Sequence, residues 1–316
     1  DYTGGGCPHI LAEPQRTNLF IQNDISTWNG FGSYAGNTTA PDGTTIDFVN
    51  MEDRRIFPTT TISNSTEYTS SIYLKGNKTA DVKLRNVSGN DTVITLSTEW
   101  QRFELTSTST AAITNSLLID NRISNGMGTP GLEIAIYGGQ VEEGSYATSY
   151  IPTSGSTVTR NQDIFTRDGI GSLINSTEGV LFVEMAATSL SSNYDVISLS
   201  DGTASNIVAI FYLANNKSIN VNIKDTNVSV FSGFASATTY PPLDFHKIAV
   251  KYKTGDFALW IDGTEVLTGS GAMTNLGLSN LQLADGNGTS NKFFGKVKQL
   301  QVYDTALTDE QLLQLT

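Results

Sequence analysis

The stretch HKIAVKYKTGDFALWIDG, residues 246–263, decides the fold because its pattern is that of an antiparallel hairpin. Two runs rich in β-branched and aromatic residues flank a short turn, Lys253-Thr254-Gly255-Asp256. The second run ends in the turn dipeptide Asp262-Gly263. These signals predict two adjacent strands of a β-sheet.

The last two dozen residues continue the same pattern. FFGKVKQLQVY, residues 293–303, alternates like a strand, and Thr308-Asp309-Glu310-Gln311 follows as an N-cap and the start of a short terminal helix. Elsewhere Gly is frequent, charged residues make up only 16%, and segments with helical periodicity are nearly absent. The sequence therefore predicts an all-β chain with one short C-terminal helix.

The order of these elements resembles the laminin-G-like, concanavalin A-type lectin sandwich. Phe245-His246 stands where Trp-His is usual in that family, Trp260-Ile261-Asp262-Gly263 stands at its "YVDG" element, and residues 303–310 stand at its "YNRALSDEEI" tail. The resemblance implies a β-sandwich. It says little about function, because sites are grafted on folds.

Turn signals also recur through the first half of the chain, for example Pro41-Asp42-Gly43 and Ser88-Gly89-Asn90. Their regular spacing predicts a second β-sandwich. The strands expected there are 44–49, 67–75, 81–87, 92–96, 100–107, 116–120 and 131–141. In the second half the strands expected are 179–187, 196–199, 207–213, 218–223, 227–231, 247–252, 257–261, 280–283 and 292–303.

A length of 316 residues is enough for two sandwiches in tandem, each with its own core. We expect an N-terminal arm over 1–17, interrupted by Pro8 and Pro14, a jelly roll over 18–158, and a laminin-G-like sandwich over 159–316.

The first half carries its own resemblance, to the jelly-roll module of phage tail and head-fibre proteins, which is related to family 4/9-type carbohydrate-binding modules. The matching segments are LAEPQRTNLF (11–20), TWNGFG (27–32), YTSSIYLKG (68–76), EWQRFELT (99–106) and the run 132–160, within which 140–144 and 150–153 are the most specific. The resemblance implies host-surface attachment and polysaccharide binding.

The net charge bears on one class of partner. A net charge of -12 argues against nucleic acid, because phosphate binding needs clustered Lys and Arg. A neutral or weakly hydrated polymer suits such a surface better, a cationic ligand or bound calcium is also compatible with it, and the alternative is that the charge serves solubility. No apolar run approaches the roughly 20 residues of a membrane span, so no membrane insertion is expected.

Aromatic side chains are the candidates for stacking on the C–H face of a sugar. Trp28, Phe31 and Tyr34 lie together in a Gly-rich loop, where they either form a glycan platform or anchor the core. Outside that loop the candidates are Trp100, Tyr194, Tyr240 and Trp260.

Calcium is the one metal that the sequence favours. Acidic and Asn-rich loops supply the oxygen ligands of this ion, and a structural calcium is common in sandwich lectins. The candidate ligands are Glu13, Asp42, Asp201 and Asp285. The alternative is that the Asp-Gly pairs simply shape turns.

No catalytic motif is visible. Glycoside hydrolysis needs two carboxyl groups on one cleft, whereas adjacent Glu142 and Glu143 face opposite sides of a strand. The pair Glu178 and Glu184 is separated along its strand. Only His9 and His246 are available for acid–base or nucleophilic chemistry.

The sequence thus predicts a non-catalytic glycan-binding or adhesion protein, by resemblance a phage fibre or tail component at a virion surface or in the extracellular space. Its expected partner is a polysaccharide or cell-surface glycan. Such proteins are often trimeric, so a homotrimer is among the assemblies implied, although the chain has no heptad segment. A polysaccharide depolymerase and a virion decoration protein without sugar affinity stay open as alternatives.

Overall fold

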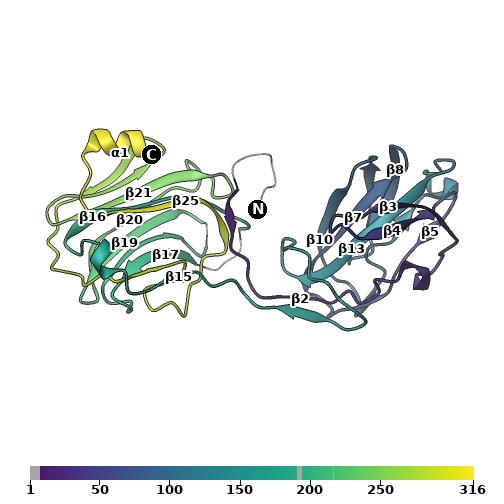
Figure 1. Ribbon diagram of the computed structural model, residues 1–316, viewed down its shortest axis with the longest axis horizontal. Helices are drawn as coiled ribbons and strands as arrows, with labels where there is room; N and C mark the ends of the chain where they lie inside the picture. The colour runs from purple at the N-terminus through teal and green to yellow at the C-terminus, as the bar shows by residue number, and fades with distance from the viewer. Residues whose placement is uncertain (1–7, 191–193, 216) are drawn as a thin grey trace. The chain divides into compact units, whose positions relative to one another are not determined.

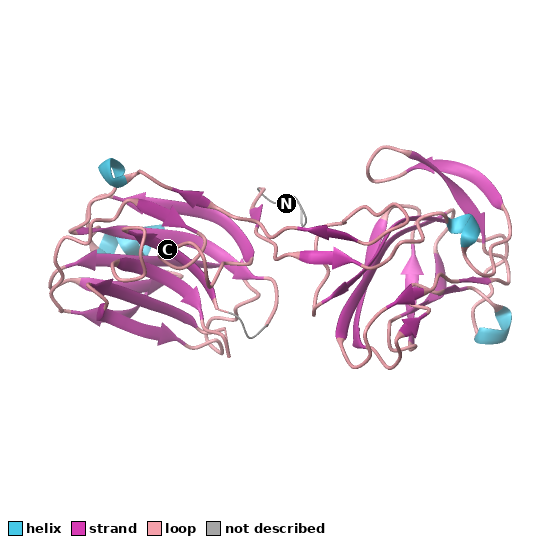
Figure 2. Cartoon of the chain, turned by 90° about the horizontal axis from the view of Figure 1, so that it is seen from below, coloured by secondary structure: helices cyan, strands magenta, loops and turns pink. Residues whose placement is uncertain are grey.

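A computed structural model describes residues 8–190, 194–215 and 217–316. The chain divides into two compact units: Gln15–Asn161 is the N-terminal unit, and Gln162–Thr316 together with the residues up to Pro14 is the C-terminal unit. Strands dominate both units (Figure 2), and the prediction of an all-β chain with a short C-terminal helix is confirmed. Among the described residues no helix is long and apolar enough to cross a bilayer.

In the N-terminal unit a five-stranded sheet, in the order β10-β7-β13-β4-β3, faces a four-stranded sheet, in the order β5-β12-β8-β9. Two short pairs, β11-β6 and β14-β2, complete the unit. The strands are β2 (Arg16–Asn18), β3 (Tyr34–Thr39), β4 (Thr45–Asn50), β5 (Arg55–Ile56), β6 (Thr60–Thr61), β7 (Glu67–Gly76), β8 (Ala80–Arg85), β9 (Asp91–Leu96), β10 (Gln101–Thr108), β11 (Ile113–Thr114), β12 (Ile119–Asp120), β13 (Glu133–Glu143) and β14 (Val158–Arg160). Two 3₁₀ turns, η1 (Ile25–Thr27) and η2 (Ile123–Asn125), lie in its loops.

The core of this unit follows from strand alternation. Ile72 and Leu74 of β7, Ile134 of β13, and Val82 and Leu84 of β8 are fully buried in one apolar cluster. Their sequence neighbours point to the opposite face of each sheet. The outer face of the five-stranded sheet therefore carries a different set of side chains, which form the site described below.

The C-terminal unit consists of two six-stranded sheets, in the orders β1-β25-β16-β21-β22-β23 and β15-β24-β17-β18-β19-β20. A 27-residue apolar cluster packs between them. The strands are β1 (Ile10–Leu11), β15 (Thr166–Arg167), β16 (Glu178–Ala187), β17 (Asp195–Ser200), β18 (Ile207–Tyr212), β19 (Ile219–Asp225), β20 (Val228–Ala235), β21 (His246–Lys253), β22 (Phe257–Ile261), β23 (Thr264–Gly269), β24 (Asn280–Gln282) and β25 (Gly295–Tyr303). A third 3₁₀ turn, η3 (Gly171–Leu173), precedes β16.

The expected N-terminal arm is partly regular structure. Its residues 1–7, with Cys7, lie outside the described residues. Between Pro8 and Pro14, however, β1 pairs antiparallel with β25 and becomes the edge strand of a sheet. After β1, the backbone N–H of Glu13 donates to the Asp163 carboxylate at 2.9 Å. The arm is thus split at Pro14: residues 8–14 belong to the C-terminal unit, where their backbone groups complete a sheet edge, and Arg16 and Thr17 lie in β2 of the N-terminal unit.

The terminal helix α1 (Asp309–Leu315) covers the outer face of the β16-β21-β22 sheet (Figure 1). Thr308 and Gln311 form a reciprocal capping box at its start, as the sequence predicts. Leu312 is fully buried against Phe182 and Trp260. The helix thereby covers Trp260, which is only 7% exposed.

We predict that Leu312→Ala lowers the free energy of unfolding of the C-terminal unit by about 2–5 kcal/mol, because it leaves a cavity under α1. Urea unfolding of the full chain measures the change. Leu313→Ala is the matched control, since Leu313 is 54% exposed and its truncation should cost less than about 0.5 kcal/mol. Equal effects of the two substitutions would contradict the packing described for α1.

Candidate functional site

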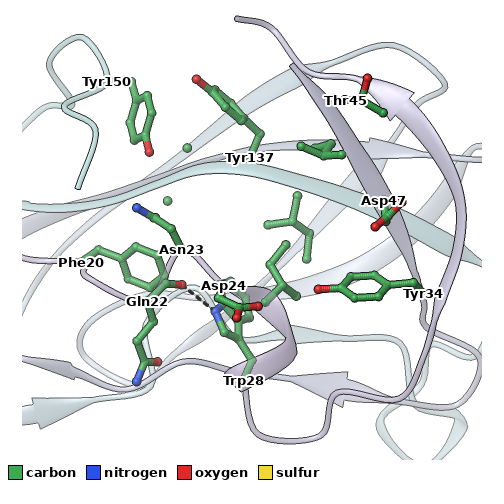
Figure 3. A pocket seen from close by; sticks show the side chains of 15 residues that line it. Phe20, Gln22, Asn23, Asp24, Trp28, Tyr34, Thr45, Asp47, Tyr137 and Tyr150 are labelled. Carbon is green, nitrogen blue, oxygen red and sulfur yellow. Dashed lines mark hydrogen bonds between the residues drawn. The ribbon is translucent and has the colours of Figure 1, made fainter. Parts of the chain in front are cut away.

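A groove opens in the five-stranded sheet where two neighbouring strands separate. The pairing of β13 with β4 ends at Ala135 and Phe48. Beyond that point, residues 45–47 and 136–139 line a cavity of about 380 Å³ (Figure 3). Its lining residues are Phe20, Gln22, Asn23, Asp24, Ile25, Trp28, Tyr34, Thr45, Ile46, Asp47, Ile136, Tyr137, Gly138, Gly139 and Tyr150.

Two adjacent glycines allow this separation. The register of β13 against β7 shifts between Tyr137 and Gln140, which is a β-bulge at Gly138-Gly139. Gly138 has φ +63°, and a Cβ there would lie 3.1 Å from the ring of Tyr73. A Cβ on Gly139 would lie 2.6 Å from the ring of Phe20. The glycines therefore let aromatic rings approach the strand from both faces.

The lower wall of the groove belongs to the core. Phe20 and Trp28 make an edge-to-face contact with ring centroids 5.8 Å apart. The Trp28 indole N–H donates to the backbone carbonyl of Gln22 at 2.8 Å, as drawn in Figure 3. Because Trp28 is only 4% exposed, its ring faces are taken up by packing. The prediction that Trp28 is a stacking platform for sugar is therefore wrong, and the alternative prediction, that Trp28 anchors the core, is the one the structure supports.

Four aromatic side chains gather beside the groove. The ring of Tyr137 lies 5.4 Å from that of Tyr150, 6.0 Å from that of Tyr73 and 6.5 Å from that of Trp100. All four are half-buried, so each keeps exposed ring surface. We call these four residues the aromatic cluster. In Figure 3, Tyr137 and Tyr150 lie across the groove from Phe20 and Trp28.

Polar contacts hold the cluster in place. The Trp100 indole N–H donates to the carbonyl of Thr39 at 2.8 Å. The Tyr137 hydroxyl is hydrogen-bonded to the Asp42 carboxylate, and burial together with this bond raises the pKa of Tyr137 to about 12. The Asp42 carboxylate also accepts from the backbone N–H of Thr44, which lowers the pKa of Asp42. At neutral pH the site thus presents a neutral phenol beside a fixed negative charge.

A strap, residues 144–153, covers the rest of the outer face and positions Tyr150. The fully buried Glu142 accepts from the Thr148 backbone N–H at 2.9 Å and from its hydroxyl at 3.1 Å. Arg102 donates to the Thr148 carbonyl at 2.7 Å. Gln140 accepts from the Ile151 N–H at 2.7 Å. Tyr150 lies between these anchored residues, so its ring is held over the sheet before any ligand arrives.

The same strap places the two adjacent carboxylates of β13 in different environments. Glu142 is fully buried under the strap, whereas its neighbour Glu143 is exposed. In the C-terminal unit Glu178 pairs with Lys253 at 3.0 Å and Glu184 with Lys298 at 3.1 Å. Of these four carboxylates, one is buried under the strap, one is exposed to solvent, and two form ion pairs with lysines.

The remaining aromatic candidates are dispersed. Tyr34 lines the groove and is 47% exposed, and its ring is 4.9 Å from that of the half-buried Phe31. Trp260 is buried under α1, so the expectation that it faces a sugar is corrected. Tyr240 packs edge-to-face on His246 against the C-terminal core.

Tyr194 keeps more of its surface. It is 41% exposed, and its ring centroid lies 6.2 Å from that of Phe211. Both belong to the outer face of the β17-β18 sheet, far in sequence from the groove.

The four candidate calcium ligands do not form one site. Glu13 belongs to the C-terminal unit, whereas Asp42 belongs to the N-terminal unit. Asp201 accepts from Thr203 and Asn206, and Asp285 from Ser290, so both shape their own loops. In the part of the chain that the structure describes, no three His, Cys, Asp or Glu side chains are placed to hold a metal ion. Calcium binding stays a prediction.

Sequence reasoning missed Tyr73, Tyr137 and Tyr150. Tyr73 and Tyr137 are directly paired across β7 and β13. Their common signal in the sequence is an aromatic residue at an outward position of an otherwise apolar strand. The Gly-Gly pair after Tyr137 marks the bulge.

Comparison with known proteins agrees with the β-sandwich fold. Residues 181–313 match the sequence profile of Laminin_G_3, described as the concanavalin A-like lectin/glucanases superfamily. The C-terminal unit therefore has a concanavalin A-like sandwich fold by sequence as well as by architecture. No curated protein matches the chain.

Several solved structures match the chain at low sequence identity. The CBM40 of the Ruminococcus gnavus IT-sialidase is 15% identical, with 48% of this chain and 98% of that chain covered and a TM-score of 0.39. Domains LG4-5 of the mouse laminin alpha1 chain are 9% identical, with 82% and 90% covered and a TM-score of 0.33. The CBM22-1-CBM22-2 tandem of Paenibacillus barcinonensis Xyn10C is 10% identical, with 95% and 99% covered and a TM-score of 0.27.

We predict that Glu142 makes the stability of the N-terminal unit depend on pH. Burial raises the pKa of its carboxyl above the ordinary 4.5, so the folded unit binds this proton more tightly than the unfolded chain does. The protonated Glu142 therefore stabilises the folded unit. Its contribution to the free energy of unfolding is fully present below pH 4.5 and is lost as the pH rises through the raised pKa of the folded state.

Urea unfolding at a series of pH values measures this effect. Glu142→Gln cannot titrate, so it should remove this component of the pH dependence. Glu143→Gln is the matched control, because the neighbouring side chain is exposed, and it should keep the component. A wild-type profile that coincides with that of Glu142→Gln would contradict the role of burial.

Proposed function

We propose that this chain is a non-catalytic glycan-binding protein whose N-terminal unit holds a polysaccharide along the groove. The observation that carries the proposal is the aromatic cluster. Four half-buried rings, those of Tyr73, Trp100, Tyr137 and Tyr150, adjoin an open groove on one sheet face. Partly exposed aromatic rings beside a polar groove are suited to the apolar C–H faces and the hydroxyls of sugars.

The polar lining complements the rings. Asn23, Asp24 and Asp47 line the groove, and Asp42 lies at the Tyr137 hydroxyl. Their oxygen atoms can accept hydrogen bonds from sugar hydroxyls, while the amide N–H groups of Asn23 already donate to Thr153 and hold the side chain in place. Because the strap fixes Tyr150 in advance, little side-chain entropy is lost when a ligand binds.

The charge of the site supports an uncharged ligand. Three carboxylates, those of Asp24, Asp42 and Asp47, lie in or beside the groove, and the whole chain carries a net charge of -12. An anionic sugar would meet repulsion from these groups at low ionic strength. Neutral polysaccharides are therefore the preferred class.

The proposed setting is the attachment of a phage fibre or tail to the surface polysaccharide of a bacterial host, at a virion surface or outside the cell. Its support is the sequence resemblance over residues 11–160. A homotrimer is the assembly proposed for this setting, and light scattering of the purified protein measures it. A monomeric mass would contradict the trimer without affecting the groove.

We predict that Tyr137→Ala weakens binding to neutral polysaccharides by about tenfold or more, because it removes the ring at the centre of the cluster. Affinity electrophoresis against xylan, mixed-linkage β-glucan, galactomannan and α-glucan measures the change. Ile123→Ala is the control, since Ile123 is exposed in a loop of the same unit. Equal retardation of wild type and Tyr137→Ala by every polymer would remove the groove from consideration.

The same polymers distinguish binding from catalysis. A non-catalytic protein leaves the length of the polysaccharide unchanged, as size-exclusion chromatography of the incubated polymer would show. Shortened products would instead establish a depolymerase.

We further predict stronger binding to neutral than to uronate-containing polysaccharides, with the difference shrinking as salt is added. Repeating both measurements with calcium and then with a chelator tests the proposed structural calcium. Preferential binding of acidic polymers at low salt would contradict the electrostatic argument.

A further inference from the structure

The outer face of the second C-terminal sheet carries a row of side chains that the groove does not account for. Phe211 of β18 is paired directly with Asn220 of β19, and Asn220 is paired directly with Phe234 of β20. The neighbours of Phe211 on its own strand, Ile210 and Tyr212, point into the core. The three residues of the row therefore share the opposite, outward face of the sheet.

The row has the dimensions of a short saccharide. Neighbouring strands lie about 4.8 Å apart, so Phe211 and Phe234 are separated by two such spacings, or about 10 Å. That is the repeat of two sugars in an extended chain, so rings at this separation face the first and third of three successive sugars. Two rings at this separation can each stack on one sugar, with the Asn220 amide between them.

Exposure distinguishes this face from ordinary packing. Phe234 is 64% exposed, although burial of a Phe ring is favourable. Tyr194 is 41% exposed beside Phe211 and extends the row at its far end. Phe211 itself rests on a small apolar cluster of Val196, Ile207 and Ala209, which fixes its ring.

Polar groups alternate with these rings. The Asn220 side-chain N–H groups donate to the Ser218 carbonyl at 2.8 Å and to the Ser218 hydroxyl at 3.1 Å, so Oδ1 is the atom of this amide that would accept from a sugar hydroxyl. Asn222 and Ser232 are paired directly in the neighbouring outward row. Amides and hydroxyls interleaved with separated rings match a hydroxyl-rich ligand. A docking protein would instead be matched by a continuous apolar patch.

We propose that the outer face of β18, β19 and β20 is a second saccharide-binding surface, with Phe211 and Phe234 stacking on sugars two strands apart and Asn220 bonding the hydroxyls between them. Its ligand class is a neutral oligosaccharide of three or more sugars. The surface belongs to the C-terminal unit and does not depend on the groove. With both sites the chain is bivalent, and binding to a polymer gains from avidity.

The test compares single and double variants of the full chain on the same neutral polysaccharides. Phe234→Ala removes an exposed ring, so the fold should persist, as circular dichroism would verify. In the Tyr137→Ala background it should weaken the remaining binding by about tenfold. Val228→Ala is the matched control, because Val228 is 63% exposed on the same strand but lies outside the row.

The outcomes separate the two sites. If Phe234→Ala matches Val228→Ala in both backgrounds, the second surface is overturned, whatever Tyr137→Ala does. If Phe234→Ala weakens binding while Tyr137→Ala has no effect, the result supports the second surface and contradicts sugar binding in the groove. A change of oligomeric mass in Phe234→Ala, with unchanged sugar binding, would identify a contact between copies of the chain and would also overturn the proposal.

Discussion

The β-bulge at Gly138-Gly139 is the constraint on which the candidate site depends. It ends the regular course of β13 just after its pairing with β4 stops, and the opening between the strands becomes the groove. The bulge also lets Phe20 approach from the core and Tyr150 from the outer face. A larger residue at Gly138 or Gly139 would clash with an aromatic ring. The bulge therefore determines both the shape of the groove and the placement of the aromatic cluster.

The strap and the groove act together. Burying Glu142 under the strap is unfavourable for its charge, and the bonds from Thr148 and Gln140 offset part of that cost. The resulting network fixes the position of Tyr150 beside Tyr137. A polar network that is unfavourable by itself thus serves to arrange the surface that a ligand would meet.

Much of the fold could be predicted from the sequence, because the deciding signals are local. The hairpin at β21 and β22, the last strand and the capping box of α1 all follow from alternation and from turn and cap residues. The exposure of aromatic residues was less predictable. Trp28 and Trp260 are enclosed by segments distant in sequence, such as the β7 and β13 strands and α1. Tyr73, Tyr137 and Tyr150 come together only through strand register.

The pairing of β1 with β25 has a consequence for how the chain is built. The polypeptide starts a sheet of the lectin-like sandwich, leaves it at Pro14, forms a whole second domain, and returns at Gln162. The N-terminal unit is therefore inserted in sequence within the C-terminal unit, between Pro14 and Gln162. A fragment that starts at Gln162 would lack a border strand, and the uncovered backbone of β25 would become a template for unwanted intermolecular pairing.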